Sequence, residues 1–115
     1  MSYRVEIAES AEHDIAEVSD VVAFAYGDPV GASRLAERIF GEIESLSELP
    51  ARYPLSRNPV LAALDCRQFT VGNFNVIYRI DEATQTVYVV AVAYCRRLTN
   101  FVAERLLNMQ YVPSR

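Results

Sequence analysis

The sequence predicts an α+β domain in which two N-terminal helices cover one face of a small sheet. Apolar residues recur every three to four positions through residues 10–47, as they do along one face of a helix. Residues 67–94 instead contain runs with strand-like patterns. Gly72-Asn73 separates two alternating segments, and both residues tolerate the positive φ of a tight hairpin. The predicted order is an N-terminal strand, an antiparallel two-helix hairpin, a three-stranded antiparallel meander and a short C-terminal helix.

Length and composition bound the class of protein. With 115 residues and 51% hydrophobic side chains, residues 1–115 are expected to form a single domain with its own core. No apolar run approaches the ~18 residues of a membrane span, and the charged N-terminus is unlike a signal peptide, so we expect a cytoplasmic protein. Cys66 and Cys95 fall at opposite ends of the predicted meander and should be free thiols. Two cysteines and one histidine make no convincing zinc site, and we expect no metal and no cofactor.

Charge is distributed unevenly between the two halves of the chain. Residues 1–50 carry three arginines against eleven acidic residues, whereas residues 51–115 carry eight arginines against four acidic residues. The predicted helices are therefore acidic and the predicted sheet is mildly basic, which would let the sheet approach an anionic partner. The whole chain has a net charge of −4. That balance disfavours direct, sequence-specific DNA binding, which relies on cations that neutralise phosphates.

The first strand and helix have recognisable boundaries. Residues 3–8 alternate like a half-buried strand, and Ser10 is the predicted N-cap of the helix that follows. Apolar residues at helical spacing extend that helix to about Tyr26, where Gly27 ends it.

The second helix begins at Asp28-Pro29, where an N-cap side chain precedes a proline at the first helical position. It is the longest predicted helix and ends before Pro50. Gly41 in its interior costs about 1 kcal/mol relative to alanine, and we expect it to permit a close backbone contact. Residues 50–59 contain three prolines and form a surface connector, and residues 60–64 are predicted to make a short helical turn.

The hairpin loop fixes which strand residues face each other. If Gly72-Asn73 forms a two-residue loop, Phe69 pairs with Val76 and Arg67 pairs with Tyr78. This face is almost wholly apolar and is expected to lie under the helices. The opposite face is a mixed polar surface that we expect to be open to a partner, and it contains Cys66, Gln68, Thr70, Asn75, Ile77 and Arg79.

The last strand and the C-terminal helix complete the prediction. Residues 87–94 are apolar on both sides, which predicts a central strand that is covered on both faces or flanked by partners. Residues 98–109 have helical spacing and form the predicted last helix.

Few residues suit acid–base or nucleophilic chemistry. His13 is the only histidine, and its place in the first turns of a helix favours a surface or half-buried structural role. Arginine and tyrosine remain, because arginine stabilises phosphates through bidentate hydrogen bonds and tyrosine can stack on a base or donate a proton. For Arg96-Arg97, just past a buried strand, functional and structural roles are about equally favoured. Arg67 either has a functional role or pairs with Glu44 or Glu48, and both alternatives are kept.

Four stretches occur in a particular order along the chain, YRVEIAESAEHDI, LSELPARYP, FNVIYRID and VYVVAVAYCRR, and they span residues 3–97. Each is mostly apolar alternation, but their order and spacing together resemble the RelE/ParE superfamily of bacterial type II toxin–antitoxin toxins. The long helical hairpin and the FNVIYRID stretch are more similar to ParE-type members.

The resemblance implies a compact toxin that a cognate antitoxin holds inactive. It also implies one of two targets, since some ParE-type members inhibit DNA gyrase whereas RelE-like members cut mRNA on the ribosome. Cleavage of mRNA would use catalytic residues at Arg67, Tyr94, Arg96 and Arg97. Residues available to bind the target or the antitoxin are Gln68, Thr70, Asn75 and Arg79.

The open face favours one of these targets. Where RelE-like members place cations, this chain has Cys66, Gln68 and Thr70, which cannot stabilise phosphorane charge as cations do. The expected function is therefore a toxin that binds a protein target such as DNA gyrase. The alternatives are a ribosome-dependent mRNA endoribonuclease, or a toxin-fold protein that has lost toxicity and survives as a binding module.

Overall fold

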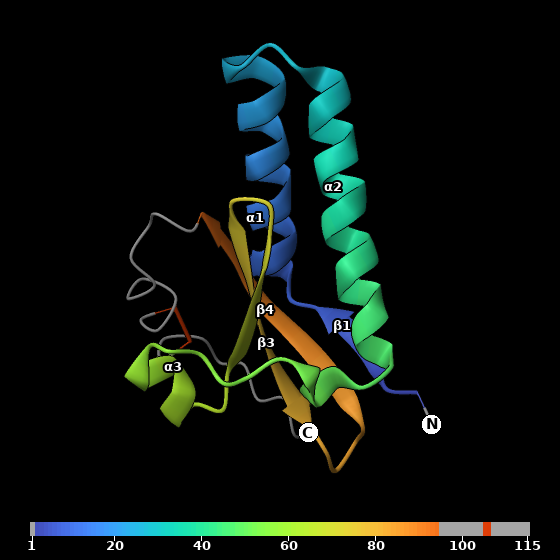
Figure 1. Ribbon diagram of the computed structural model, residues 1–115, viewed down its shortest axis with the longest axis vertical. Helices are drawn as coiled ribbons and strands as arrows, with labels where there is room; N and C mark the ends of the chain where they lie inside the picture. The colour runs from blue at the N-terminus through green and yellow to red at the C-terminus, as the bar shows by residue number, and fades with distance from the viewer. Residues whose placement is uncertain (1, 95–104, 107–115) are drawn as a thin grey trace.

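The computed structural model describes residues 2–94 and 105–106, and it has two helices on one face of a four-stranded sheet (Figure 1). This is the predicted α+β architecture. The predictions that concern Cys95, Arg96, Arg97 and most of the helix over 98–109 fall outside the described residues. The elements are β1 (Arg4–Ile7), α1 (Glu9–Asp20), a π-helical turn (Val21–Ala25), α2 (Pro29–Glu44), two short 3₁₀ turns (Ser45–Ser47 and Pro50–Arg52), α3 (Pro59–Ala63), β2 (Arg67–Val71), β3 (Phe74–Asp81) and β4 (Thr86–Tyr94).

The sheet has the strand order β1-β4-β3-β2, with β1 parallel to β4 and the other neighbours antiparallel. The predicted hairpin register is confirmed, since Phe69 pairs with Val76 and Arg67 pairs with Tyr78. Gly72 has a φ of +59°, which glycine adopts without the steric cost that other residues meet. The prediction that the last strand is central is also confirmed, because β4 lies between β1 and β3 and is buried on both faces.

A β-bulge interrupts the pairing between β3 and β4. Ile77 pairs with Ala91 and Tyr78 pairs with Val89, so Val90 is an extra residue without an opposite partner on β3. Val89 therefore contacts the hydrophobic cluster under the long helices, while Val90 and Ala91 both contact the cluster on the other face. Bulges of this kind increase the local twist of a strand.

The helical hairpin forms largely where the sequence predicts it. The carboxylate of Asp28 accepts a hydrogen bond from the Gly31 N–H at 2.9 Å, and Pro29 is the first residue of α2. Gly27 takes a φ of +63° where the first helix ends. The prediction for Ser10 is wrong: Ala8 occupies the N-cap of α1 without a side-chain hydrogen bond, and Ser10 lies within the helix.

Both helices pack their apolar stripes against the same face of the sheet. This first cluster combines residues of α1, of α2 and its C-terminal turn, and of strands β2, β3 and β4. Fully burying a large aliphatic side chain stabilises the fold by roughly 1.5–3 kcal/mol, so these contacts dominate the stability. Its buried members are Ala11, Ile15, Ile39, Ile43, Leu46, Phe69, Val71, Val76, Tyr78, Val87, Val89 and Val92.

Side chains of α1 cover the part of the β4 edge that β1 does not reach. β1 pairs with β4 only as far as Val89. Beyond that point the Ser10 hydroxyl donates to the Val90 carbonyl at 3.3 Å, and the Val92 N–H donates to the Asp14 carboxylate at 3.0 Å. Buried backbone groups need such partners, because an unpaired buried N–H or C=O is costly. The helix therefore takes the place of a longer strand.

Asp14 also holds the described part of the C-terminal segment. The two guanidinium nitrogens of Arg105 donate to the two carboxylate oxygens of Asp14, at 2.7 and 3.1 Å. Both side chains are mostly buried. This hydrogen bonding raises the pKa of Arg105 above its ordinary value. The carboxylate therefore bridges a strand backbone and a guanidinium that lies 91 residues away in sequence.

Gly41 does not make the close backbone contact that we expected. It lies exposed in the interior of α2, and a Cβ added there would have nothing within 4 Å. Elsewhere, Cys66 is a free, buried thiol. No helix within the described residues has both the length and the apolar run required to cross a bilayer.

Replacing Gly41 with alanine should raise the free energy of unfolding by about 0.5–1 kcal/mol, because alanine fits the free space and has a better helix propensity. Urea denaturation followed by circular dichroism measures the change. The matched control is Gly72→Ala, which should lower stability because the φ of Gly72 is +59°. A destabilising Gly41→Ala substitution would contradict the exposed position of this glycine.

Replacing Asp14 with alanine should lower the free energy of unfolding by about 1–3 kcal/mol, because it leaves a buried N–H and a half-buried guanidinium without their acceptor. Asp14→Asn keeps one acceptor oxygen and should cost less. Asp20→Ala on the same helix is the control, since Asp20 is exposed and should change stability by less than about 0.5 kcal/mol. Equal effects of Asp14→Ala and Asp20→Ala would argue against this bridge.

Candidate functional site

The face of the sheet that we expected to be open is largely covered. α3 packs against it through Leu61, and Leu64 and Leu106 add to the same cluster. Cys66 and Ile77 are fully buried and Asn75 is 7% exposed, so none of the three presents a free surface. The alternation of the strands identified this face correctly as separate from the first cluster. It did not reveal that residues 59–64 fold back over it.

Thr70 is the one predicted binding residue on this face that the structure leaves exposed. Gln68 is half-buried, and its side-chain oxygen accepts a hydrogen bond from the Ser56 hydroxyl at 2.6 Å. Ser56 is itself buried and accepts from the Asn58 N–H at 3.1 Å, directly before α3. Gln68 therefore helps to fix the connector that leads into α3.

Arg79 lies half-buried beside Cys66. Its Nε atom is buried and has no hydrogen-bond partner in the described part of the chain, and the same holds for Oδ2 of Asp81 two residues later. Burial raises the pKa of the Cys66 thiol to about 11, although the positive charge of Arg79 acts in the opposite direction. The thiol therefore stays protonated at neutral pH, which makes it a weak nucleophile.

Arg67 and Tyr78 hold the proline-rich connector against the sheet. The Arg67 guanidinium donates to the carbonyls of Tyr53 at 2.5 Å and Ala51 at 3.4 Å. Of the two roles left open for Arg67, the described residues do not show pairing with Glu44 or Glu48. The Tyr78 hydroxyl donates to the Pro50 carbonyl at 2.5 Å.

Burial is the main reason why the pKa of Tyr78 is raised to about 12, and it outweighs the opposing effect of the Arg67 charge. Packing supports the same arrangement, because the rings of Tyr53 and Phe69 are stacked with centroids 4.5 Å apart. We refer to these hydrogen bonds from Arg67 and Tyr78 as the connector clamp. A tyrosine with so high a pKa remains protonated at neutral pH and serves as a hydrogen-bond donor.

Tyr94 lies at the other end of the sheet from Arg67. Tyr94 pairs with Phe74 and their ring centroids are 5.4 Å apart, whereas Arg67 pairs with Tyr78. Four residues of strand separate these two positions on β3, a distance of about 13 Å. The structure therefore does not bring Arg67 and Tyr94 together.

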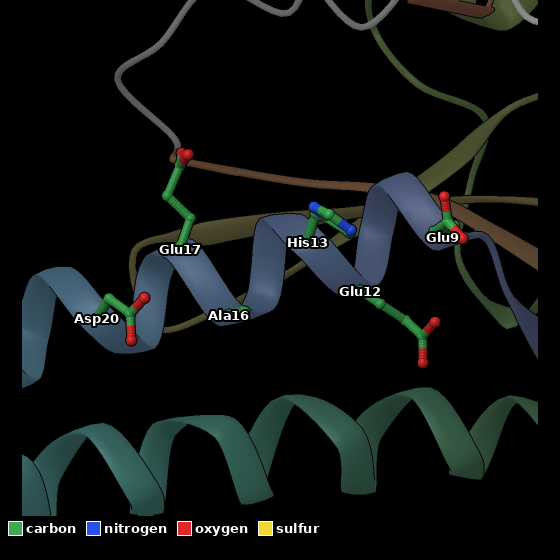
Figure 2. A pocket seen from close by; sticks show the side chains of 6 residues that line it. All are labelled: Glu9, Glu12, His13, Ala16, Glu17 and Asp20. Atoms are coloured by element: carbon green, nitrogen blue, oxygen red, sulfur yellow. The ribbon is translucent and has the colours of Figure 1, made fainter.

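His13 lies on the exposed side of α1, in a shallow depression lined by Glu9, Glu12, Glu17, Ala16 and Asp20 (Figure 2). Figure 2 shows the side chains of Glu12 and Glu17 pointing to opposite sides of the helix, so these carboxylates do not converge on the imidazole. Within the described residues, no group of three histidine, cysteine or acidic side chains could hold a metal ion. The exposed position of His13 agrees with the predicted surface role.

Sequence reasoning missed the residues at the β4 edge. Asp14 and Arg105 lie in two different predicted helices, and no local pattern in the sequence connects one with the other. Ser10 and Asp14 are four residues apart, which places them on the same side of α1. That spacing indicates that the two side chains share one side of the helix. It does not reveal that β1 is too short to cover the edge of β4.

Comparison with known proteins identifies the family. A family model described as the ParE toxin of the type II toxin–antitoxin system parDE matches residues 5–99. A search of curated proteins found no match.

Three solved structures resemble the chain. The chromosomal ParDE toxin–antitoxin system from P. aeruginosa aligns with a TM-score of 0.67 at 14% identity, over 81% of this chain and 96% of that chain. A mutant of the E. coli toxin RelE in the free state aligns with a TM-score of 0.63 at 13% identity, over 95% and 100%. The toxin–antitoxin complex RelBE2 from Mycobacterium tuberculosis aligns with a TM-score of 0.54 at 26% identity, over 82% and 99%.

The structural likenesses at 13–14% identity show a shared fold, and they agree with the match of the family model. That match extends over most of the sequence, from the first strand to just beyond the last. The chain therefore belongs to the ParE toxin family of type II toxin–antitoxin systems, within the RelE/ParE superfamily.

Proposed function

We propose that this toxin inhibits growth by binding a protein target such as DNA gyrase, and that a cognate antitoxin neutralises it. The observation that carries the proposal is the connector clamp. Arg67 is the described arginine that mRNA cleavage would use, and its guanidinium is engaged by two backbone carbonyls. A guanidinium in that position stabilises the connector, and it would have to leave these carbonyls to contact a phosphate.

The other described candidates point in the same direction. Tyr94 is about 13 Å along the sheet from Arg67, too far for both to act on one phosphate. His13 is exposed on α1, and the carboxylates beside it do not converge on its imidazole (Figure 2). Ribosome-dependent cleavage would therefore depend on Arg96 and Arg97 with little help from the described residues.

The proposed antitoxin partner is suggested by the relatives. The P. aeruginosa structure is of a ParDE system, and the M. tuberculosis structure is of a RelBE2 toxin–antitoxin complex. Among the sequence-predicted binding residues, Thr70 is exposed, Gln68 and Arg79 are half-buried, and Asn75 is buried. We therefore place the antitoxin contact at Thr70 and the adjoining outer edge of β2.

The geometry of β2 suits the addition of an antitoxin strand. β2 is an edge strand, and the connector covers only its beginning, where Leu55 pairs with Arg67 and the Gln68 N–H donates to Pro54 at 3.4 Å. The Gln68 N–H thus points outward. Because N–H directions alternate along a strand, the Thr70 N–H points outward as well and is available to a strand added at this edge.

The purified toxin should inhibit DNA supercoiling by purified gyrase and should leave mRNA intact on translating ribosomes. Full gyrase activity in the presence of excess toxin would contradict the proposed target. Cleavage of mRNA that disappears in an Arg96→Ala/Arg97→Ala double variant would establish the alternative, a ribosome-dependent endoribonuclease. Induction of the toxin without antitoxin tests the third possibility, because a protein that has lost toxicity would not arrest growth.

Thr70→Pro should weaken antitoxin binding by about tenfold or more, because proline removes an outward N–H that the added strand would use. Its partner strand β3 lies on the other side, so the sheet itself should persist. Thr70→Val is the control, since it keeps the N–H and suits a strand. Isothermal titration with the antitoxin encoded beside the toxin gene measures both variants. Equal affinities of the proline and valine variants would rule out strand addition at this edge.

A further inference from the structure

The far end of the helical hairpin exposes large apolar side chains that the fold does not use. α1, the π-helical turn and α2 extend well beyond the sheet, so the turn between the helices projects away from both hydrophobic clusters (Figure 1). We call this end the aromatic tip and define it by its exposed apolar residues, with exposed fractions of 47% for Val21, 82% for Phe24, 75% for Tyr26 and 60% for Val30.

The backbone at the tip is also unusual. Residues Val21–Ala25 form a π-helical turn, in which the Tyr26 N–H donates to the Val21 carbonyl at 3.3 Å. Such turns are rare and are frequently found at functional sites. Phe24 belongs to this turn, is largely exposed and packs against neither cluster of the protein core. Exposed aromatic side chains grouped in this way mark interaction sites more often than ordinary surface.

The charges around the tip are mostly negative. From Val5 to Ser33 the chain has seven carboxylates, and the first cation beyond the tip is the exposed Arg34, four residues after Val30. Glu17 and Asp20 are exposed on the last turns of α1, next to the tip. A partner that receives the aromatic side chains would gain from cations around its pocket, which also steer association.

The size of the tip argues against a second copy of this chain as the occupant. An aromatic side chain buries about 150–250 Å² when it is covered, so the two aromatic side chains of the tip remove roughly 300–500 Å² from water. Two tips packed together would remain below the ~1,200 Å² of total area that stable interfaces require. Two such tips would also bring their carboxylates together, and like charges repel.

We propose that the aromatic tip is the surface with which this toxin docks onto its protein target, in an apolar pocket rimmed by basic residues. This inference rests on the proposed function, in which the target is a protein such as DNA gyrase. An enzyme that binds DNA carries lysine and arginine on its DNA-contacting surface, which supplies the charge that the acidic helix end complements. The docking site is then distinct from the β2 edge assigned to the antitoxin.

The test is a Phe24→Ser/Tyr26→Ser double variant of the full chain, compared with Leu49→Ser. Leu49 is 78% exposed and lies at the opposite end of α2, so it matches Phe24 in exposure without belonging to the tip. Circular dichroism establishes that both variants fold. The double variant should bind purified DNA gyrase about tenfold or more weakly than the natural chain, and Leu49→Ser should bind within about twofold.

Charge provides a second measurement. A Glu17→Gln/Asp20→Asn variant should associate with gyrase several-fold more slowly, and raising the salt concentration should slow the natural chain in the same way. If neither the charge-neutralising variant nor the higher salt concentration changes the association rate, the pocket of the target has no basic rim.

The remaining outcomes separate this inference from the proposed function. If the natural chain binds gyrase and the double variant binds equally well, the tip is not the docking surface, although the target stands. If the natural chain does not bind gyrase, the next measurement is growth arrest on induction of each variant. Loss of arrest in the double variant alone supports docking of the tip to another protein. Equal arrest in all variants, or no arrest in any of them, overturns the inference. Selective loss of antitoxin binding or of self-association in the double variant would also overturn it.

Discussion

The difference in length between β1 and β4 is the constraint on which much of this structure depends. β4 is nine residues long, whereas β1 has four, so the edge of β4 beyond Val89 has no strand beside it. Ser10 and Asp14 supply the missing hydrogen bonds, which fixes the first turns of α1 against that edge. The position of α1 in turn sets where α2 packs, because the two helices share the first cluster. The projection of the hairpin away from the sheet follows from this arrangement.

Local signals in the sequence predicted most of the fold. Gly72-Asn73 set the hairpin register, and Asp28-Pro29 set the start of α2, because each depends on residues that are adjacent in the chain. Ser10 was misjudged because its hydroxyl bonds to Val90, 80 residues away. The covered second face was missed for the same reason, since Leu61 of α3 reaches residues of β3 and β4 that no local pattern connects to it.

The candidate site was less predictable than the fold. The alternation of apolar and polar residues along the strands predicted which side chains share each face of the sheet. The roles of the polar side chains depend instead on which backbone groups lie near them in the fold. Arg67 was available for phosphate binding or for a carboxylate on α2, and it bonds instead to carbonyls of the connector. A connector with three prolines has fewer N–H groups to bond its own carbonyls, so these carbonyls need donors from elsewhere. The arginine and tyrosine of neighbouring strands provide them.

The bulge at Val90 has a consequence for the end of the sheet. Without Val90, the residues before and after it would still alternate correctly between the two faces, so the extra residue is not required to sort the side chains. Its effect is on the path of the strand, which twists more strongly between Val89 and Ala91. The bulge thereby sets the direction in which β4 ends at Tyr94. A chain of the same pattern but without this residue would keep both hydrophobic clusters and aim the end of its last strand elsewhere.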